Sequence, residues 1–538
     1  MTCSLVHLLL PEVVLTVAAC ALFFVGAMSK GVARRAAPSI ALGGLIAALI
    51  ALIFFSPSPT DSPTLVVSDS TGSVRLTQLS TFIKTLAGLV GVVLLLLAWP
   101  TDPDGRSSRS LHLGEDGGEF FGLALLSICG VMLVAGANDI ILLFLALELV
   151  SIPTYVMVSI SRPLPQSQEA GVKYFFLGAM AAALMLFGLS YLYGTTGSTK
   201  LTAITSVFQA PGATLTPWQL LGIVVLVGAL AFKIAAVPLH FYVGDVYEGA
   251  ATPVTAFLAF VPKTAGFVAL VKVLGAVGGL QMRFGPELSG LLWVLAVATM
   301  SVGNVLALLQ RNVKRVLAYS SVAHSGYMLV GLAVLTGAGA LDVRREALVG
   351  LLFYLAAYGI MNAGAFGVLM MLPAKPRIWG ESPPPYTTAE TYDDLVGQGR
   401  RHPGLGLLMA IACFSLIGLP LTVGFMGKLF LIAPALKAGS EAMTWLAILT
   451  LVNAAISAAY YLRIVGAMFL RDEVGEAQAP SEPSTKPVPL LAAVVLSGAA
   501  TLLLGMPPGT NLLANTSTMS ATIDTARIEP ILTTRPAK

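Results

Sequence analysis

Long apolar stretches recur along the whole chain, and they constrain its fold more than any other feature. About fourteen such runs are each close to or above the length that crosses a bilayer. They cover residues 8–28, 38–56, 82–99, 119–136, 138–160, 168–194, 217–248, 252–279, 287–309, 314–337, 347–372, 403–436, 443–470 and 487–508. Charged residues make up 11% of the chain, against about 25% in soluble proteins. The sequence therefore predicts an all-α integral membrane protein that forms one large helical bundle in the lipid bilayer.

Composition and motifs exclude several classes of protein. The net charge of +4 is small, and the basic residues lie mainly in alternating loops, which does not suggest nucleic-acid binding. Cys3, Cys20, Cys129 and Cys413 are isolated, so we expect no haem, iron–sulfur cluster or structural zinc. No GxSxG, Walker or HExxH motif is present. The first apolar run carries Glu12 and has no basic region before it, so we interpret it as a retained helix and not a signal peptide.

Basic residues in the loops predict an orientation, because short cytoplasmic loops are enriched in lysine and arginine. If the N-terminus is outside, the inner loops hold most of them: Lys30, Arg34, Arg35, Arg106, Arg109, Arg162, Arg311, Lys314, Arg315, Lys375, Arg377, Arg400 and Arg401. The opposite loops hold Arg75, Lys200, Arg283, Arg344 and Arg345. With an even number of crossings, both termini are expected on the outer side.

Two of the apolar runs are too long for a simple crossing and carry proline and glycine near the middle. They are residues 217–248, with AVPLH, and 403–436, with IGLPLTVGF, and we expect both to be broken helices. Corresponding broken helices in two halves of a chain are typical of transporter folds built from inverted repeats. The sequence match between the two segments does not by itself show that the repeat is inverted.

The broken helices suggest a division of the chain. We predict an N-terminal three-helix segment (1–118), two five-helix repeats (119–279 and 287–470), and a last helix with a short tail (487–538). No further helix is expected after Pro507. The polar, proline-rich stretches at 56–73 and 373–400 are interpreted as linkers or lateral surface segments.

Prolines inside apolar runs leave backbone carbonyls without their helical partner. Pro238, Pro262 and Pro420 are expected to free the carbonyls of Ile234, Leu258 and Leu416. At membrane depth such groups persist where protein or water satisfies them. A hydrated site near the first break is one interpretation, and a kinked packing helix is the other.

Glu148 lies within about nine largely apolar residues on either side, and Lys233 lies just before the first break. Burial disfavours the charged form of each group, whereas mutual proximity favours it. A pair balanced in this way can change its charge when its spacing changes, which would gate a proton path. The alternative is a static buried ion pair that fixes packing.

Further ionisable residues lie in apolar surroundings. Lys263 and Lys428 are candidate proton-relay sites, since an intramembrane lysine is costly and usually functional. His324 can pass a proton between its ring nitrogens or serve as a structural histidine. His240 shares the helix face of Lys233 only if the helix continues through Pro238, so it is a weaker candidate for the relay.

Four other basic residues lie near helix ends. Lys173 is close to a helix start, where its side chain can extend to the interface, and it is a candidate of lower weight. Lys84, Lys272 and Arg463 are interpreted as interfacial.

Four motifs in order give the chain a family resemblance. GVKYFFLGAM, FKIAAVPLHFYVGDVYEGAATPVTAFLAFVPK, RNVKRVLAYSSVAHSGYMLVG and GLPLTVGFMGKLFL resemble the antiporter-like membrane subunits of complex I, the proton-pumping NADH:quinone oxidoreductase. The resemblance covers nearly the whole chain and is closest to the bacterial N-type subunits. It implies fourteen helices with two inverted five-helix repeats, each containing a broken helix.

The resemblance also assigns roles residue by residue. It implies that Glu148 matches the glutamate of the family's fifth helix and Lys173 the lysine of the sixth. Lys233 matches the lysine of the first broken helix, Lys263 that of the eighth helix, and His324 the histidine of the tenth.

In the second broken helix the M-type subunits resemble a GFxGE pattern, whereas this chain has Gly427 and Lys428. Lysine there favours the N type, and the lack of a long amphipathic helix after residue 508 argues against the L type.

The function implied is that of a translocase subunit without a redox centre of its own. NADH, FMN, iron–sulfur clusters and quinone are expected in other subunits, and M-, K- and J-like membrane subunits are expected as neighbours. The location implied is the bacterial cytoplasmic (inner) membrane. Alternatives are a cation/proton antiporter subunit of the Mrp type, a hydrogenase membrane arm, a stand-alone solute carrier and a structural spacer.

Overall fold

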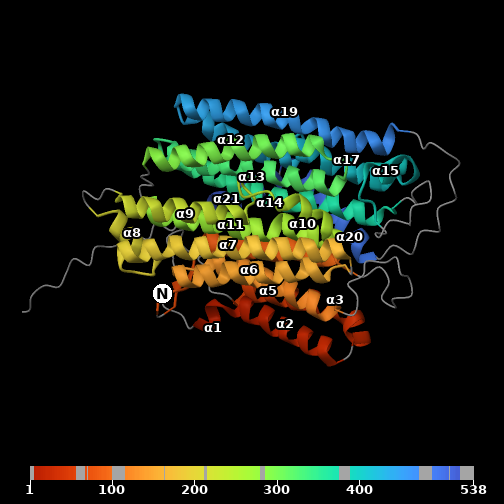
Figure 1. Ribbon diagram of the computed structural model, residues 1–538, viewed down its shortest axis with the longest axis horizontal. Coiled ribbons are helices and arrows are strands. Elements are labelled where there is room, and N and C mark those ends of the chain that lie inside the picture. The colour runs from red at the N-terminus through yellow and green to blue at the C-terminus, as the bar shows by residue number, and fades with distance from the viewer. Residues whose placement is uncertain are drawn as a thin grey trace, which may run out of the picture.

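The computed structural model describes residues 5–28, 30–55, 67–69, 71–99, 116–162, 164–210, 215–278, 285–374, 388–471, 488–507 and 509–520. Figure 1 shows long helices lying side by side along the long axis of the molecule. Within the described residues, eleven helices are long and apolar enough to cross a membrane. Three shorter apolar helices, Pro217–Lys233, Pro403–Ile417 and Val488–Leu503, accompany them. The all-α membrane fold is thereby confirmed, while the count of fourteen crossings stays a prediction.

The described helices follow one another along the chain in two halves. The helices of the first half are α1 (Leu5–Leu8), α2 (Leu10–Met28), α3 (Lys30–Ile50) with the π-helical turn η1 (Ala51–Phe55), α4 (Gln78–Leu97), α5 (Gly117–Gly136), α6 (Ile140–Ile160), α7 (Pro165–Thr196), α8 (Leu201–Phe208), α9 (Pro217–Lys233), α10 (Val243–Gly249) and α11 (Thr252–Gly278). Those of the second half are α12 (Pro286–Leu309), α13 (Val313–Gly337), α14 (Leu341–Met371), α15 (Tyr392–Leu395), α16 (Gln398–Arg401), α17 (Pro403–Ile417), α18 (Val423–Lys437), α19 (Glu441–Phe469), α20 (Val488–Leu503) and α21 (Gly509–Ser520).

Both predicted helix breaks are present. The first separates α9 from α10, and the second separates α17 from α18. In each break a residue other than glycine has a left-handed backbone, Ala235 with a φ of 58° and Leu421 with a φ of 69°. Such conformations cost energy and persist where the surroundings fix them. The division into repeats at 119–279 and 287–470 stays a prediction.

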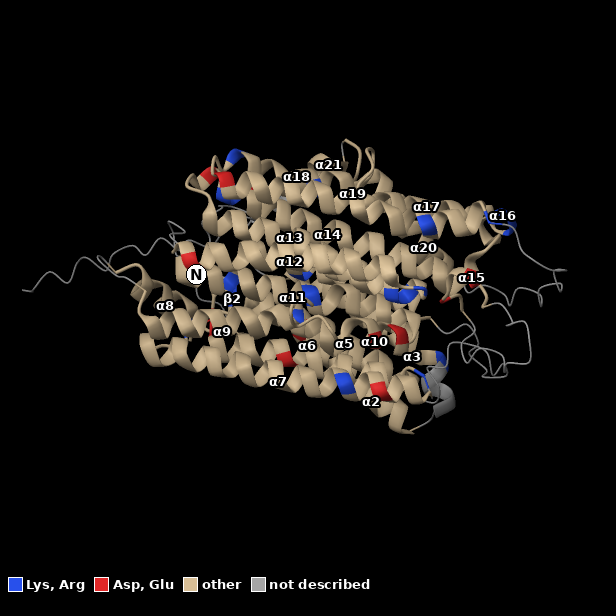
Figure 2. Cartoon of the chain, turned by 45° about the horizontal axis from the view of Figure 1, so that its top comes forward, with Lys and Arg blue, Asp and Glu red and all other residues tan. Residues whose placement is uncertain are grey.

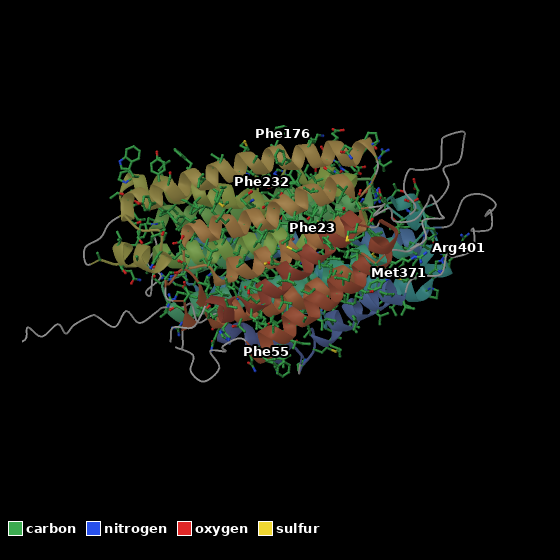
Figure 3. The ribbon with its side chains drawn as sticks, turned by 90° about the horizontal axis from the view of Figure 1, so that it is seen from below. Phe23, Phe55, Phe176, Phe232, Met371 and Arg401 are labelled. Atoms are coloured by element: carbon green, nitrogen blue, oxygen red, sulfur yellow. The ribbon has the colours of Figure 1, made fainter. Side chains whose placement is uncertain are left out.

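Helices α11 and α13 form the centre of the bundle. The most apolar window of each is completely buried, and α11 packs against α5, α6, α9, α13 and α14. Figure 3 shows Phe55 and Phe176 on opposite sides of the bundle, whereas Phe232 lies inside it. The exposed apolar side chains suit a surface in contact with lipid or other membrane helices. The residues at the centre are therefore shielded from bulk water.

Charged residues gather mainly at the two ends of the bundle, with a few in the middle (Figure 2). At one end Val313 N donates to Glu390 O at 2.7 Å, which joins two of the predicted inner loops. At the other end Asp139 pairs with Lys200 through an isolated β-bridge. Five residues used for the orientation lie outside the described part of the chain: Arg106, Arg109, Arg283, Lys375 and Arg377.

The expectation of no helix after Pro507 is wrong. Helix α21 packs against α4 and α14, and Thr510 Oγ1 donates to Leu504 O at 2.8 Å. Its sequence is only weakly apolar, and its helical form is supported by these tertiary contacts, which hydropathy does not register.

The described parts of the two polar, proline-rich stretches, predicted as linkers or lateral surface segments, have defined structure. Part of the first forms a small antiparallel hairpin, β1 (Val67–Ser68) with β2 (Arg75–Leu76). The end of the second is buried, since Glu390 and Asp394 expose 2% and 4%. Hydrogen bonds to backbone groups and ion pairs hold this polar stretch inside, and the sequence pattern does not reveal such partners.

Close packing of α12 and α13 depends on glycine. A Cβ at Gly326 would lie 2.4 Å from Met300 N, and one at Gly303 would lie 2.6 Å from Ala323 N. Both neighbours are backbone atoms, so neither can move aside as a flexible side chain would. Small residues at such crossings let two membrane helices approach closely.

We therefore predict that Gly326→Ala destabilises the protein. The added methyl group should cost about 1–3 kcal/mol through overpacking, more than the roughly 1 kcal/mol gained in helix propensity. Thermal unfolding of the purified membrane complex measures the change. Gly290→Ala, on exposed α12 surface with nothing within 4 Å of the new Cβ, is the matched control. Equal melting temperatures for the two variants would contradict the prediction.

Candidate functional site

Glu148 and Lys233 form an ion pair beside the first helix break. Lys233 Nζ lies 2.9 Å from Glu148 Oε1 and donates to Ser151 Oγ at 2.6 Å. The lysine ends α9, and the carboxylate and the serine lie one turn apart on α6, so they face the same side chain. The side chains expose 4% and 16%. The pair is therefore nearly withdrawn from solvent and has one additional hydrogen bond.

A serine joins this break to the next lysine. Ser325 Oγ on α13 donates to Ile234 O at 2.6 Å, and Lys263 Nζ donates to the same Oγ at 2.8 Å. The freed carbonyl predicted from Pro238 is thus satisfied by a side chain of the protein. Because Ile234 follows Lys233 directly, the backbone of the break and Lys263 share one hydrogen-bonded group.

Lys263 lies at the centre of the bundle on α11. Its Nζ also donates to Ser321 O at 2.5 Å and lies 5.8 Å from the ring centroid of Tyr358. Within the described residues it has no ion pair with a carboxylate, and it exposes 2%. A lysine held in this way, by neutral oxygens and an aromatic face, is an expensive feature in a membrane protein and points to function.

His324 lies between two tyrosine hydroxyl groups. Its Nδ1 is 2.8 Å from Tyr354 Oη and its Nε2 is 3.0 Å from Tyr461 Oη. The imidazole is fully buried, and the ring of Tyr358 lies 5.1 Å from it. The ring of Tyr358 thus lies close to both Lys263 and His324. With both nitrogens engaged, the histidine is oriented for accepting a proton at one nitrogen and donating one at the other.

Lys428 closes onto the second break. Its Nζ donates to Leu416 O at 2.9 Å and Ile417 O at 2.6 Å, the last carbonyls of α17. These carbonyls carry the negative end of the helix dipole, which stabilises a cation there. The ring of Tyr327 lies 4.9 Å from the same Nζ and 5.5 Å from the ring of His324. An aromatic ring is again close to two relay candidates.

A charged network surrounds the end of α10. Lys314 Nζ donates to Glu248 O at 3.1 Å, Ala250 O at 2.7 Å and Glu390 Oε1 at 3.1 Å. The same carboxylate oxygen lies 2.6 Å from Arg162 Nη2. Lys314 is completely buried and Glu390 exposes 2%. Two cations thus meet on one carboxylate, and one of them also donates to two backbone carbonyls, where α6, α10, α13 and the segment before α15 come together.

Surface charges extend this network. Arg315 pairs with Asp245 at 2.9 Å and with Glu248 at 2.7 Å. Lys173 pairs with Asp245 at 2.9 Å and with Glu169 at 2.7 Å, and it exposes 42%. The half-helix α10 is therefore tied to α7 and α13 by ion pairs at the end of the bundle.

Comparison with known proteins identifies the family of this chain. The family model described as NADH:quinone oxidoreductase/Mrp antiporter, TM, matches residues 137–457, which is more than half of the chain and includes all seven predicted site residues. The chain belongs to this family.

Relatives and solved structures agree with this membership. A protein of Trichlorobacter lovleyi named NADH-quinone oxidoreductase subunit N is 37% identical over 502 residues, covering 93% of this chain and 94% of that protein. A protein of the same name from Myxococcus xanthus is 40% identical over 415 residues, covering 74% and 77%. A chain of respiratory complex I from Thermus thermophilus with bound aureothin has a TM-score of 0.71 at 32% identity, covering 93% and 98%. A chain of the Mrp complex from Dietzia sp. has a TM-score of 0.77 at 19% identity, covering 96% and 97%, and shows a common fold.

Five of the seven predicted residues in this NADH:quinone oxidoreductase/Mrp antiporter family member lie along one buried series. They are Glu148, Lys233, Lys263, His324 and Lys428. The other two lie apart from it. Lys173 belongs to the surface network. His240 lies half-buried in the first break, and no hydrogen-bond partner of its Nδ1 is found among the described residues.

Sequence reasoning missed the groups that connect these residues. Ser325, Tyr354, Tyr358 and Tyr461 are ordinary apolar-helix residues by pattern, and Tyr461 comes from α19, far from the others in sequence. Their spacing on the helices carried no distinct signal. Glu390 was missed because it lies in a proline-rich stretch that resembled a linker.

The interpretation of Lys84 as interfacial is wrong. Its Nζ lies 2.6 Å from Glu12 Oε1, and the two side chains expose 0% and 4%. Lys84 is close to the start of α4, which suggested that its side chain could extend to the interface, but α2 and α5 cover that side chain. Among the described residues, no three or more His, Cys, Asp or Glu gather as a metal site.

We predict that Glu390→Ala strongly destabilises the protein. Removal of the carboxylate leaves Lys314 and Arg162 without their common partner, and breaking a buried ion pair typically costs about 3–5 kcal/mol. Thermal denaturation of the purified complex measures the loss. The control is Glu346→Ala, which breaks the exposed pair with Lys437 and should cost less than about 1 kcal/mol. A similar melting temperature for both variants would show that the buried network does not fix α10.

Proposed function

We propose that the chain is a proton-translocating membrane-arm subunit of an NADH:quinone oxidoreductase. The observation that carries the proposal is the buried series of ionisable side chains from the first helix break to the second, linked by hydroxyl groups and aromatic rings. Relatives that are 35–40% identical are named NADH-quinone oxidoreductase subunit N, which gives the reaction that drives the transfer. The subunit contributes proton movement, while electron transfer takes place in other subunits.

The path begins at the basic end of the bundle, taken as the cytoplasmic side. Tyr247 lies on α10 and is buried, whereas the carboxylates of that helix lie at the surface. Its hydroxyl group is 3.3 Å from Ser321 Oγ. Ser321 in turn holds Lys263 through its carbonyl. The carbonyl has no proton to pass on, so in this proposal a water molecule carries the proton from the Tyr247 and Ser321 hydroxyl groups to Lys263.

From Lys263 the proton passes to His324 and then to Lys428. Tyr358 lines the first interval and Tyr327 the second. Neither interval is closed by a direct hydrogen bond between relay groups, so water molecules complete both steps in this proposal. Exit then occurs from Lys428 toward the outer side.

The Glu148/Lys233 pair controls the charge on Lys263. A positive charge that is released from its carboxylate partner repels a proton on the neighbouring lysine, and one that is neutralised does not. The hydrogen bond from Ser325 to Ile234 O couples movement of the break to the same lysine. Opening of the ion pair thus favours release of the proton from Lys263 toward His324.

Placement in the enzyme follows from this assignment. Both termini lie on the outer side of a bacterial inner membrane, and M-, K- and J-like subunits are the neighbours. The five-helix units 119–279 and 287–470 act as the input and output halves of one inverted repeat, with Lys233 before its break and Lys428 after its own. NADH, FMN, iron–sulfur clusters and quinone belong to other subunits.

An antiporter subunit of the Mrp type and a hydrogenase membrane arm are the alternative assignments. The Mrp likeness rests on 19% identity, which supports the fold, whereas the likeness to NADH-quinone oxidoreductase subunit N rests on higher identity over most of the chain. Co-purification of the native complex with a flavin and iron–sulfur arm that oxidises NADH decides between them.

Lys263→Ala in the assembled enzyme is the central test. A positioned proton-transfer group typically contributes about 10²-fold or more, so we expect at least about a tenfold slower proton transfer through this subunit. Proton uptake into proteoliposomes per NADH oxidised is the measurement. NADH oxidation with an artificial acceptor should be unchanged, because the redox chemistry lies elsewhere.

The control for this test is Lys437→Ala, which removes an exposed lysine on α18 that pairs with Glu346. We expect wild-type pumping from it. Undiminished pumping by Lys263→Ala, with the complex intact, would remove the central role of that lysine and with it the proposed path.

A further inference from the structure

Outside the relay, a second buried ion pair lies among the N-terminal helices. Lys84 Nζ on α4 is 2.6 Å from Glu12 Oε1 on α2, and both side chains are more than nine-tenths buried. Neither carboxylate oxygen nor the ammonium group has a regularly oriented hydrogen bond among the described residues. A buried pair whose remaining acceptors and donors are unfilled is poorly compensated for its loss of hydration. Packing alone gives no reason to keep charges here, because an apolar pair of the same volume would fill the space.

Helix ends and polar groups surround the ion pair and favour charge at this position. Glu12 lies in the first turn of α2, whose end is positive, and a Cβ at Gly136, at the negative end of α5, would lie 3.9 Å from Lys84 Nζ. Cys129 on α5 also faces the pair, with its Sγ 3.7 Å from Glu12 O. Lys272 on α11 donates to Ala137 O at 2.8 Å, just beyond the same end of α5.

The pair is within reach of the outer aqueous side as assigned above. Lys84 is six residues from the start of α4 at Gln78, which corresponds to about 9 Å along the helix. The β1–β2 hairpin lies at that end of the bundle, and Val74 pairs with Ala137 there. A proton therefore has a short distance to cover between water and the carboxylate.

A single helix separates this pair from the first relay pair. Helix α5 packs against α2 and α4 on one side, and on the other side Ser127 Oγ donates to Val150 O of α6, two residues beyond Glu148. Figure 1 shows α5 between α2 and α6. With helix axes about 8–10 Å apart, the two ion pairs are roughly 15–20 Å apart.

We propose that Glu12 and Lys84 form a second proton-binding site that acts on the Glu148/Lys233 pair through α5. When a proton binds to a Glu12 carboxylate oxygen, an O–H bond forms and the pair changes from net neutral to a net charge of +1. Release of the proton to the outer side restores neutrality. At this separation and an effective dielectric constant of about 20, one unit charge changes a neighbouring proton-binding equilibrium roughly fivefold. The inference rests on the proposed function, since it adds a second site to that relay.

The test uses the intact complex with three variants: Glu12→Gln, Lys84→Met and the double variant. The double variant is expected to assemble, because it leaves no unpaired buried charge, whereas each single variant leaves one and is expected to be less stable. Each assembled variant should oxidise NADH with an artificial acceptor at the wild-type rate. Proton uptake into proteoliposomes should fall about fivefold in each, including the double variant, in line with the Coulomb factor given above. A redox-induced infrared difference spectrum should lose one protonated-carboxyl band in Glu12→Gln, which a static pair would not produce.

Two results would overturn the inference. One is wild-type pumping by the uncharged double variant, which would assign the pair to packing alone. The other is an infrared difference spectrum of Glu12→Gln that equals that of the wild type. If a single variant fails to assemble, the double variant carries the test, because it leaves no unpaired buried charge. Lys263→Ala, measured alongside, separates failure of the relay from failure of the second site. Wild-type pumping by Lys263→Ala and by the double variant would contradict the relay itself. Loss of pumping in Lys263→Ala alone would contradict only the second site.

Discussion

Backbone carbonyls without helical partners are the constraint on which the centre of this protein depends. A membrane interior offers no water to an open carbonyl, so each helix break must be satisfied by the protein. Here the first break is closed by Ser325, which donates to Ile234 O, and the second by Lys428, which donates to Leu416 O and Ile417 O. The groups that close the breaks are the same groups that the proposed relay uses. Structural necessity and proton chemistry are therefore combined in single side chains.

Burial of charge imposes the second constraint, and the protein meets it in two ways. At the basic end, Lys314 and Arg162 share Glu390, so each cation is in direct contact with a carboxylate. At the centre, Lys263 has carbonyl, hydroxyl and aromatic neighbours in place of a carboxylate. The first arrangement holds a charge in a fixed state and suits a structural role. The second lets the charge depend on what its neighbours do, as a relay requires.

Close packing and ion pairs hold the elements around these groups in place. Helices α12 and α13 approach through Gly303 and Gly326, and α13 carries His324, Ser321 and Ser325 on its buried faces. The half-helix α10, by contrast, is short and is tied down by side chains from its neighbours. The ion pairs of Arg315 join α10 to α13, which carries the serines in contact with the central lysine.

The sequence by itself determined the membrane fold, both helix breaks and the residues that line the buried series. Apolar length and proline decide these features locally, and an ionisable residue in a long apolar run, such as Lys263 or Lys428, is visible without any structure. Which groups meet was decided by the tertiary structure alone. Tyr461 reaches His324 from α19, and Glu390 reaches Lys314 from a stretch that resembled a linker.

The same distinction accounts for the errors. Helix α21 exists through contacts with α4 and α14, and Lys84 is enclosed by α2 and α5, so local hydropathy gave the wrong answer for both. A helix end looks accessible in sequence, but burial depends on which helices pack beside it. Periodicity and composition report the energy of a segment in lipid, whereas partners distant in the chain decide where a charge can be held.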